Sequence, residues 1–156
     1  MSNTVFQKIA VIGAGTMGSG IAAQIANAGH DVMLFDLPAR DGDDKSPAEQ
    51  AIDRLMVSDP PQLMQKRNAD RITTGTISDD FDALANCDWI IEAVVERLDI
   101  KKDLYRRLDA TIGPDCIVSS NTSTIPISLL VEDMPPAFRQ RLSLIHISEP
   151  TRQSKI

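Results

Sequence analysis

Three glycines near the amino terminus have the spacing that lets a backbone bind phosphate. Gly13–Gly18 has the sequence Gly-Ala-Gly-Thr-Met-Gly, and Asp36 follows 18 residues after its last glycine. In this pattern the first glycine permits a tight turn, the second lets the main chain approach a pyrophosphate, and the third lets a helix pack closely on a strand. Helix amides then face the phosphates, and a carboxylate accepts ribose hydroxyls. The pattern predicts a dinucleotide-binding turn, and its alternative is a turn in which the glycines act only sterically.

The carboxylate of Asp36 also indicates which dinucleotide is bound. A negative charge repels the 2′-phosphate of NADP and accepts the 2′-hydroxyl of NAD, so we expect NAD as the cofactor. Arg40, four residues further along, is the one feature that favours a phosphate. The residues of this region expected to bind the cofactor are Gly13, Gly15, Thr16, Met17, Gly18 and Asp36.

The elements that position this motif follow from the hydrophobic pattern. Lys8–Ile12 is a short apolar run that predicts a strand buried on both faces, and apolar residues at helical spacing follow it as far as Gly29. Asp31–Asp36 predicts a second strand. Together these segments form a βαβ unit, so the opening third of the chain is expected to be α/β.

The segment over residues 37–70 predicts a helical insertion after the second strand. A polar loop leads to Pro47, which suits the first turn of a helix, and Pro60-Pro61 must interrupt that helix. We expect a second short helix to begin at Leu63-Met64.

The rest of the chain continues the alternation of strands and helices. Strands are predicted over Arg71–Thr74, Trp89–Val95 and Cys116–Ser120, and apolar residues from Ile100 to Leu108 predict a helix between the last two. This order predicts a Rossmann-like α/β fold, with a doubly wound, mainly parallel sheet.

Composition excludes several functional classes. The 156 residues are 42% hydrophobic, and 16 basic against 22 acidic residues give a formal net charge of −6. An acidic chain is repelled by nucleic acids and anionic membranes, so neither is an expected partner. Glycines interrupt the apolar run after Ile9, which argues against a signal peptide or membrane span. Cys87 and Cys116 lack metal-site spacing, so we expect no metal, two buried thiols and a cytoplasmic location.

Two later motifs narrow the prediction to a family. Trp89–Glu96 has the sequence Trp-Ile-Ile-Glu-Ala-Val-Val-Glu, and Ser120–Ser123 has the sequence Ser-Asn-Thr-Ser. With residues 9–36, these motifs resemble the N-terminal domain of 3-hydroxyacyl-coenzyme A dehydrogenase over about residues 7–141. The resemblance implies an acyl-CoA substrate, held partly by the insertion. It also implies NAD-dependent oxidation of a 3-hydroxyacyl thioester to a 3-ketoacyl thioester in fatty-acid β-oxidation.

The resemblance assigns roles to residues that follow two strands. Ser123 is similar to the residue that holds the substrate hydroxyl beside the nicotinamide, and Asn121 is similar to a supporting residue at the same turn. Without the resemblance, Ser-Asn-Thr-Ser is a capping or turn sequence, and the nearby charges merely open a solvated helix. Glu92, inside an apolar strand, has no predicted role beyond a buried or edge carboxylate. Glu96 and Lys101 resemble family residues near the nicotinamide-side ribose, and Ala93 and Val94 are also expected to bind the cofactor.

The family's catalytic base is a histidine that a glutamate orients and charges. His30 follows a helix end and is expected on the surface, away from the ligand edge. His146 lies at the catalytic register after Arg141, but the sequence after it departs from the family's Phe-Phe-Asn-Pro. The segment Leu142–Arg152 resembles a sequencing adaptor translated in frame. We therefore interpret residues 1–141 as the NAD-binding domain and 142–156 as a non-native tail, with a divergent natural terminus as the alternative.

On this interpretation the family's helical C-terminal domain is absent, and the chain binds NAD without useful turnover. The full-length protein is then expected to be a homodimer or part of a multifunctional β-oxidation enzyme. Two other functions share the opening motif: another β-hydroxyacid or sugar-nucleotide dehydrogenase of the Rossmann type, and a module that binds NAD without catalysis. The first of these is not expected to carry both later motifs. Replacing Ser123 in a full-length chain distinguishes the second from a 3-hydroxyacyl-CoA dehydrogenase, because little effect on turnover would count against the dehydrogenase.

Overall fold

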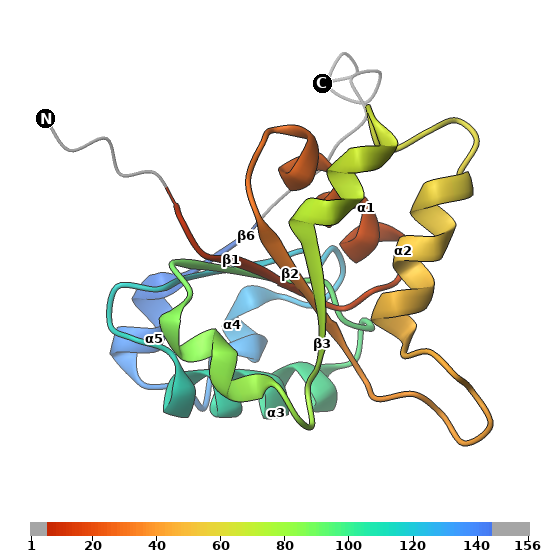
Figure 1. Ribbon diagram of the computed structural model, residues 1–156. Helices are drawn as coiled ribbons and strands as arrows, with labels where there is room; N and C mark the ends of the chain where they lie inside the picture. The colour runs from red at the N-terminus through yellow and green to blue at the C-terminus, as the bar shows by residue number, and fades with distance from the viewer. Residues whose placement is uncertain (1–5, 145–156) are drawn as a thin grey trace, which may run out of the picture.

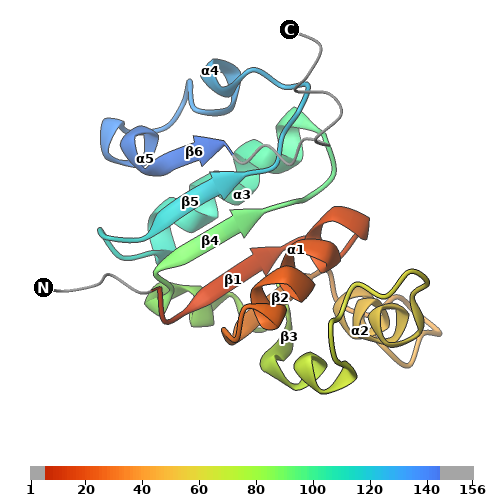
Figure 2. The same cartoon turned by 90° about the horizontal axis from the view of Figure 1, so that it is seen from above.

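The computed structural model describes residues 6–144, which form a six-stranded sheet in which all neighbouring strands are parallel. The strands are β1 (Ile9–Ile12), β2 (Val32–Asp36), β3 (Ile72–Thr76), β4 (Trp89–Glu92), β5 (Ile117–Ser120) and β6 (Leu142–Leu144). Their order, β3-β2-β1-β4-β5-β6, confirms the predicted doubly wound, Rossmann-like fold. The chain runs outward from β1 to β3 and then returns to place β4 on the other side of β1 (Figure 2). The point at which the strand order reverses therefore lies between β1 and β4.

Helices cover both faces of the sheet (Figure 1). Ile9 and Val11 of β1 belong to the apolar cluster of one face, and Ala10 and Ile12 belong to that of the other. This alternation is the period of two that a strand imposes on its side chains. The first face carries α1 (Thr16–Asn27) and α2 (Pro47–Val57), and the second carries α3 (Leu98–Thr111), α4 (Ile127–Leu130) and α5 (Pro136–Arg141).

The predicted helical insertion is present as α2, and local sequence explains where it begins. The Ser46 hydroxyl accepts a hydrogen bond from the Glu49 amide, and the Glu49 carboxylate accepts one from the Ser46 amide. This reciprocal capping pairs two amides that the first turn of the helix leaves free. Pro47 takes the first helical position, where no amide hydrogen is needed.

The second predicted helix of the insertion, starting at Leu63-Met64, was wrong. The Asn27 side chain at the end of α1 donates to the Gln62 carbonyl at 2.8 Å and accepts from the Met64 amide at 2.9 Å. Those peptide groups therefore bond to α1 rather than to a helix of their own. A short 3-10 helix, η1 (Lys66–Arg71), forms only after them, and a second, η2 (Phe81–Asn86), leads from β3 to β4.

The strand predicted over Trp89–Val95 ends three residues early, at Glu92. The Ala93 amide still donates to the Ile12 carbonyl at 2.8 Å, but the Val94 amide donates to the Glu92 carboxylate at 3.1 Å. The main chain therefore leaves the sheet directly after Glu92. Hydrophobic pattern could not reveal this, because Ala93–Val95 continues the apolar run while Val95 is 59% exposed.

β6 adds an edge strand beyond the five that the hydrophobic pattern predicted. It pairs with β5 in parallel, with Val118 opposite Leu142 and Ser120 opposite Leu144. The predicted domain boundary at residue 141 lies directly before this strand, and the interpretation of 142–156 as a tail stays a prediction. Sequencing the encoding DNA beyond codon 141 tests it. His146 lies outside the described residues.

Candidate functional site

Four strands bring the candidate residues to one edge of the sheet. The glycine turn follows β1, Asp36 ends β2, residues 93–97 follow β4 and residues 121–124 follow β5. Because the strands are parallel, their carboxyl ends all lie at this edge, and the strand order reverses between β1 and β4 (Figure 2). In open α/β sheets, this is where ligands bind.

The first and third glycines of the turn are required by the packing of the turn itself. Gly13 has a φ of +110°, and a Cβ atom there would lie 2.3 Å from the Ala93 carbonyl oxygen. A Cβ atom on Gly18 would lie 1.7 Å from the Gly13 carbonyl oxygen. Both distances are far below van der Waals contact, so only glycine lets the turn approach β4 and α1 so closely.

Gly15 differs, because the described chain gives no steric reason for a glycine there. It lies before the first residue of α1 with a φ of −71°, and a Cβ atom would meet nothing within 4 Å. No side chain caps the amides of α1, and no acidic residue lies in its first turn. The open space above Gly15 and the uncapped helix start fit a phosphate that approaches the main chain, so the residues present fit a dinucleotide.

Asp36 is held against the glycine turn by two backbone amides. Its Oδ2 accepts from the Ala14 amide at 2.6 Å, and its Oδ1 accepts from the Leu37 amide at 2.6 Å. On the other side of the turn, Arg54 of α2 donates to the Ala14 carbonyl at 2.9 Å. The Ala14 residue is thus bonded at both its amide and its carbonyl. Sequence reasoning considered Arg40 as the basic residue of this region and missed Arg54.

Between β4 and α3 lies a buried carboxylate with donors on every side. Glu92 is fully buried, and Lys101 Nζ donates to its two oxygens at 2.9 and 3.2 Å. The carboxylate also accepts from Tyr105 Oη at 2.6 Å and Ser120 Oγ at 2.8 Å. Burial and the Glu92 charge raise the pKa of Tyr105 well above its ordinary value, so its hydroxyl stays a donor.

Glu96 connects the turn after β4 with the turn after β5. Its carboxylate accepts from Thr122 Oγ1 and, at 3.4 Å, from the Ser123 amide, and Lys101 Nζ lies 3.8 Å from its Oε1. Partial burial opposes ionisation, but the Thr122 hydrogen bond, the Lys101 charge and the Ser123 and Ile125 amides outweigh it. The pKa of Glu96 is therefore below its ordinary value, and the group is a carboxylate at neutral pH.

The remaining predicted residues differ in accessibility. Thr16, Met17 and Ser123 are exposed, whereas Lys101 is 1% exposed and directed at Glu92. A direct contact between Lys101 and a cofactor, which the resemblance implied, remains a prediction. Partly buried members of the predicted set are Ala93, Val94 and Asn121.

Sequence reasoning assigned no role to some residues of this edge. Tyr105 occupies an ordinary apolar helix position, and within the Ser-Asn-Thr-Ser motif only Asn121 and Ser123 were assigned roles, whereas Ser120, which ends β5, and Thr122 were not. The one available signal was Glu92, a charge within an apolar strand. His30 lies where expected: it is exposed and lines a hollow with Ile9 and Trp89, which begin β1 and β4 at the opposite edge.

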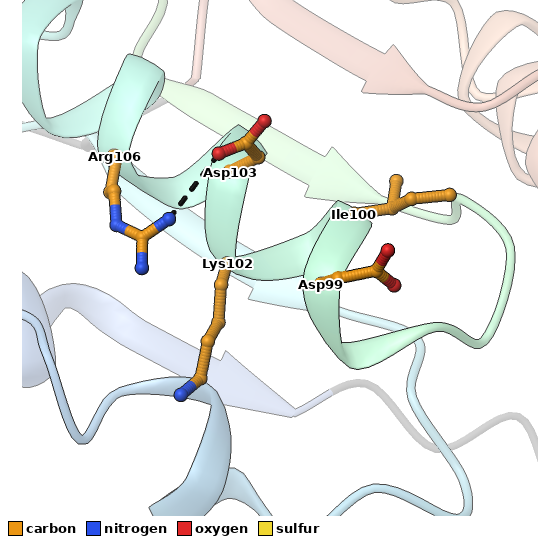
Figure 3. A pocket seen from close by; sticks show the side chains of 5 residues that line it. All are labelled: Asp99, Ile100, Lys102, Asp103 and Arg106. Atoms are coloured by element: carbon orange, nitrogen blue, oxygen red, sulfur yellow. Dashed lines mark hydrogen bonds and ion pairs between the residues drawn. The ribbon is translucent and has the colours of Figure 1, made fainter.

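The outward face of α3 carries a shallow pocket that does not belong to this edge (Figure 3). Lys102, beside the buried Lys101 in sequence, pairs instead with Glu132 and Asp133 on the surface. Ion pairs among its neighbours make the pocket a solvated charged face. Its lining residues are Asp99, Ile100, Lys102, Asp103 and Arg106.

Between residues 6 and 144, no three His, Cys, Asp or Glu side chains gather closely enough to hold a metal ion. Over the same range, no helix is both long and apolar enough to cross a membrane.

The fold and this edge define the class of the protein. A parallel sheet in this order, with a glycine turn after the first strand and an acidic residue ending the second, is a dinucleotide-binding α/β domain. The chain belongs to the family described as 3-hydroxyacyl-CoA dehydrogenase, NAD binding domain, whose profile matches residues 8–156. This confirms the predicted family and its cofactor, NAD.

Individual relatives agree with this assignment. A "Probable 3-hydroxyacyl-CoA dehydrogenase" of Deinococcus radiodurans is 38% identical over 147 residues, which cover 94% of this chain and 42% of the relative. The crystal structure of 3-hydroxybutyryl-CoA dehydrogenase from Escherichia coli K12 is similar with a TM-score of 0.76 and 31% identity, over 95% of this chain and 31% of that one. The dehydrogenase part of multifunctional enzyme 1 from C. elegans has a TM-score of 0.70 and 25% identity, over 93% and 32%. The chain therefore spans less than half the length of these proteins.

Proposed function

We propose that the chain is the NAD-binding half of an enzyme that oxidises 3-hydroxyacyl-CoA thioesters to 3-ketoacyl-CoA thioesters. The observation that carries this proposal is the single edge at which Gly15, Asp36, Glu96 and Ser123 follow four parallel strands. NAD, when bound, supplies the hydride acceptor. The chain's own residues bind and orient the cofactor and the substrate hydroxyl.

The β1–β2 end would hold the adenosine diphosphate part of NAD. The open space over Gly15 admits the pyrophosphate beside the uncapped amides of α1. Asp36, fixed by the Ala14 and Leu37 amides, accepts the ribose hydroxyls and repels a 2′-phosphate. Exposed Leu37 offers an apolar surface beside the carboxylate.

The β4–β5 end would hold the nicotinamide part and the reacting hydroxyl. Glu96 is an ionised acceptor for the ribose, and the exposed Ser123 lies at the adjacent turn, where its hydroxyl can hold the substrate oxygen. The proton acceptor for the reaction is not among the described residues, because His30, the one histidine of residues 6–144, lies at the opposite edge.

Binding and turnover of the 156-residue chain are tested together. NADH fluorescence should give saturable binding that NAD displaces more readily than NADP does, and acetoacetyl-CoA should cause no NADH oxidation above background. Turnover at the rate of a full-length dehydrogenase would refute the proposal that this chain binds NAD without useful turnover. Failure of the folded chain to bind NADH would refute the cofactor role.

A binding module without catalysis is the second candidate function, favoured by the lack of a described proton acceptor. The Ser123→Ala variant of a full-length chain distinguishes this module from a dehydrogenase. Loss of turnover with NADH affinity retained supports the dehydrogenase, and unchanged turnover counts against it.

The cellular setting is also proposed rather than observed. We propose a reducing, cytoplasmic location, because Cys87 and Cys116 are buried free thiols whose burial raises their pKa values to about 12 and about 11. Acyl-CoA is the proposed substrate. A homodimer or a multifunctional β-oxidation enzyme is the proposed assembly, and size measurement of a full-length chain distinguishes the two.

A further inference from the structure

A closed ring of contacts joins the two turns that would hold the nicotinamide end of the cofactor. Glu92 accepts from Ser120 Oγ at 2.8 Å, and Ser120 Oγ accepts from the Thr122 amide at 3.2 Å. Thr122 Oγ1 donates to Glu96, Lys101 Nζ lies 3.8 Å from Glu96, and Lys101 returns to Glu92 at 2.9 Å. These five residues, Glu92, Lys101, Ser120, Thr122 and Glu96, are called the Glu92 ring below.

The chemistry of the ring requires a carboxylate at position 92. Each described contact to the two Glu92 oxygens comes from a donor: Lys101, Tyr105, Ser120 and the Val94 amide. An amide in its place would direct one of its own donors at these groups. Because the site is buried, no water replaces the lost partner, so the geometry depends on the charge.

The ring acts on both turns from beneath them. Through the Val94 amide, Glu92 bends the chain out of β4, toward Glu96. Through Ser120, it fixes the Thr122 amide in the turn that carries Ser123. It also holds the buried Lys101, whose Nζ lies 3.8 Å from Glu96.

We propose that Glu92 is a positioning residue, which sets the spacing of Glu96 and Ser123 and shares Lys101 with Glu96 without touching the cofactor or substrate. This inference rests on the proposed function, because Glu96 and Ser123 are taken as the nicotinamide-side residues. It predicts that breaking the ring weakens nicotinamide-side binding while leaving adenosine-side binding intact.

Two adjacent serines of β5 provide a matched test. Ser120 belongs to the ring, whereas the Ser119 hydroxyl accepts from Trp89 Nε1 at 2.9 Å and lies 2.8 Å from that of Ser143. Ser120→Ala removes the hydroxyl that donates to Glu92 and accepts from the Thr122 amide, so it should speed exchange of that amide and weaken NADH binding about fivefold. Its affinity for AMP, which has only the adenosine end, should stay within about twofold. Ser119→Ala should leave all three measurements unchanged.

Glu92→Gln tests the centre of the ring. It should speed exchange of both the Val94 and Thr122 amides, and it should weaken NADH binding about tenfold with AMP binding unchanged. Should this variant not fold, Ser120→Ala and Tyr105→Phe carry the test, because each removes a single hydroxyl contact with Glu92.

The outcomes separate this inference from the proposed function. Equal effects of Ser120→Ala and Ser119→Ala, or parallel losses of NADH and AMP affinity, would show a merely structural role and overturn the inference. Unchanged amide exchange with normal NADH binding in the Ser120→Ala and Glu92→Gln variants would overturn the positioning role of Glu92 and leave the proposed function standing. A folded wild-type chain that binds no NADH would overturn the proposed function and the cofactor-positioning role with it.

Discussion

The two halves of the candidate site are built in opposite ways. At the β1–β2 end, the site is shaped by missing side chains and by backbone groups: Gly13 and Gly18 permit close approach, and Asp36 bonds to amides. At the β4–β5 end, the buried side chains of Glu92 and Lys101 lie beneath the turns. The shape of the β1–β2 half is therefore determined by steric limits, and that of the β4–β5 half by charges buried away from solvent.

This difference concerns stability as well as shape. Burying two charges costs desolvation energy, which their attraction offsets only when the remaining donors and acceptors are satisfied. Within residues 6–144, no buried side-chain nitrogen or oxygen lacks a hydrogen-bond partner, and the Glu92 ring meets this condition. The β4–β5 end should consequently be the more sensitive to removal of one partner.

The largest effect is expected for Lys101→Met, which leaves Glu92 as a buried charge without its counterion. Removing one partner of a buried pair destabilises a protein by about 3–5 kcal/mol, so urea unfolding should show a loss of that order. Lys45→Met is the control, because the Lys45–Asp53 pair is more than half exposed and its loss should change stability by at most about 1 kcal/mol. Equal losses would remove the contrast between buried and surface charge.

A smaller loss is expected for Gly18→Ala. The new Cβ atom would lie 1.7 Å from the Gly13 carbonyl oxygen, and overpacking of this kind costs about 1–3 kcal/mol, occasionally more. Gly15→Ala, whose Cβ meets nothing within 4 Å, should leave stability unchanged and weaken NADH binding instead. Thermal unfolding and NADH titration of both variants measure the two effects, and a destabilised Gly15→Ala would argue against a role in phosphate binding.

Asp36→Ala should weaken NAD binding by about tenfold or more, because a hydrogen bond to a charged group contributes about 1.5–3 kcal/mol. NADP binding should fall less, since the repulsion of its 2′-phosphate is lost at the same time. Asp31→Ala, in an exposed ion pair with Arg71, is the control and should alter neither affinity. Equal losses for the two cofactors would exclude Asp36 as the residue that distinguishes them.

Arg54→Gln should have a still smaller effect. It removes one hydrogen bond to the Ala14 carbonyl from an exposed side chain, which contributes about 0.5–1.5 kcal/mol. NADH affinity should fall by less than it does in Asp36→Ala, and exchange of the Val94 amide should not change. A faster Val94 exchange would mean that the two halves are not independent.

The smallest effect is a pH dependence from Glu96. Its pKa in the folded chain is lowered from the ordinary value of 4.5, so its contribution to stability is fully present above about pH 4.5 and is lost as the pH falls through the lowered pKa. Glu96→Gln should therefore lower stability by a constant amount at higher pH and flatten the stability profile below about pH 4.5, so that the slope of the profile near pH 7 to 8 is unchanged. An identical profile in both chains would contradict the assigned contacts.

The same comparison explains how much the sequence could predict. The alternation of strands and helices and the glycine motif follow from short-range patterns, and Gly18 is constrained by the Gly13 carbonyl within the same βαβ unit. Gly13 differs, because its constraint comes from the Ala93 carbonyl after β4, which only the folded sheet brings close. The early end of β4 could not be predicted, since it depends on the Val94 amide donating to the Glu92 carboxylate. The failed helix at Leu63-Met64 depended on Asn27 in the same way.

The site shows the same division. Asp36 was identified by its spacing from the glycines, and Glu96 and Ser123 by the family resemblance. No role was predicted for their supports, Tyr105 and Thr122, because a helix tyrosine and a threonine of the Ser-Asn-Thr-Ser turn acquire their roles only when β4, α3 and β5 pack together. Glu92 was noticed as unusual, but only its partners explain it.

We propose that the two differently built halves form one NAD site at the carboxyl edge of the sheet. The most direct test is NAD titration of the isotope-labelled chain, followed by amide chemical shifts. Saturable shifts with a single affinity are expected at Gly15, Leu37, Glu96 and Ser123, and none at His30 on the opposite edge. Shifts confined to one half, or centred on His30, would exclude a single NAD site at the carboxyl edge.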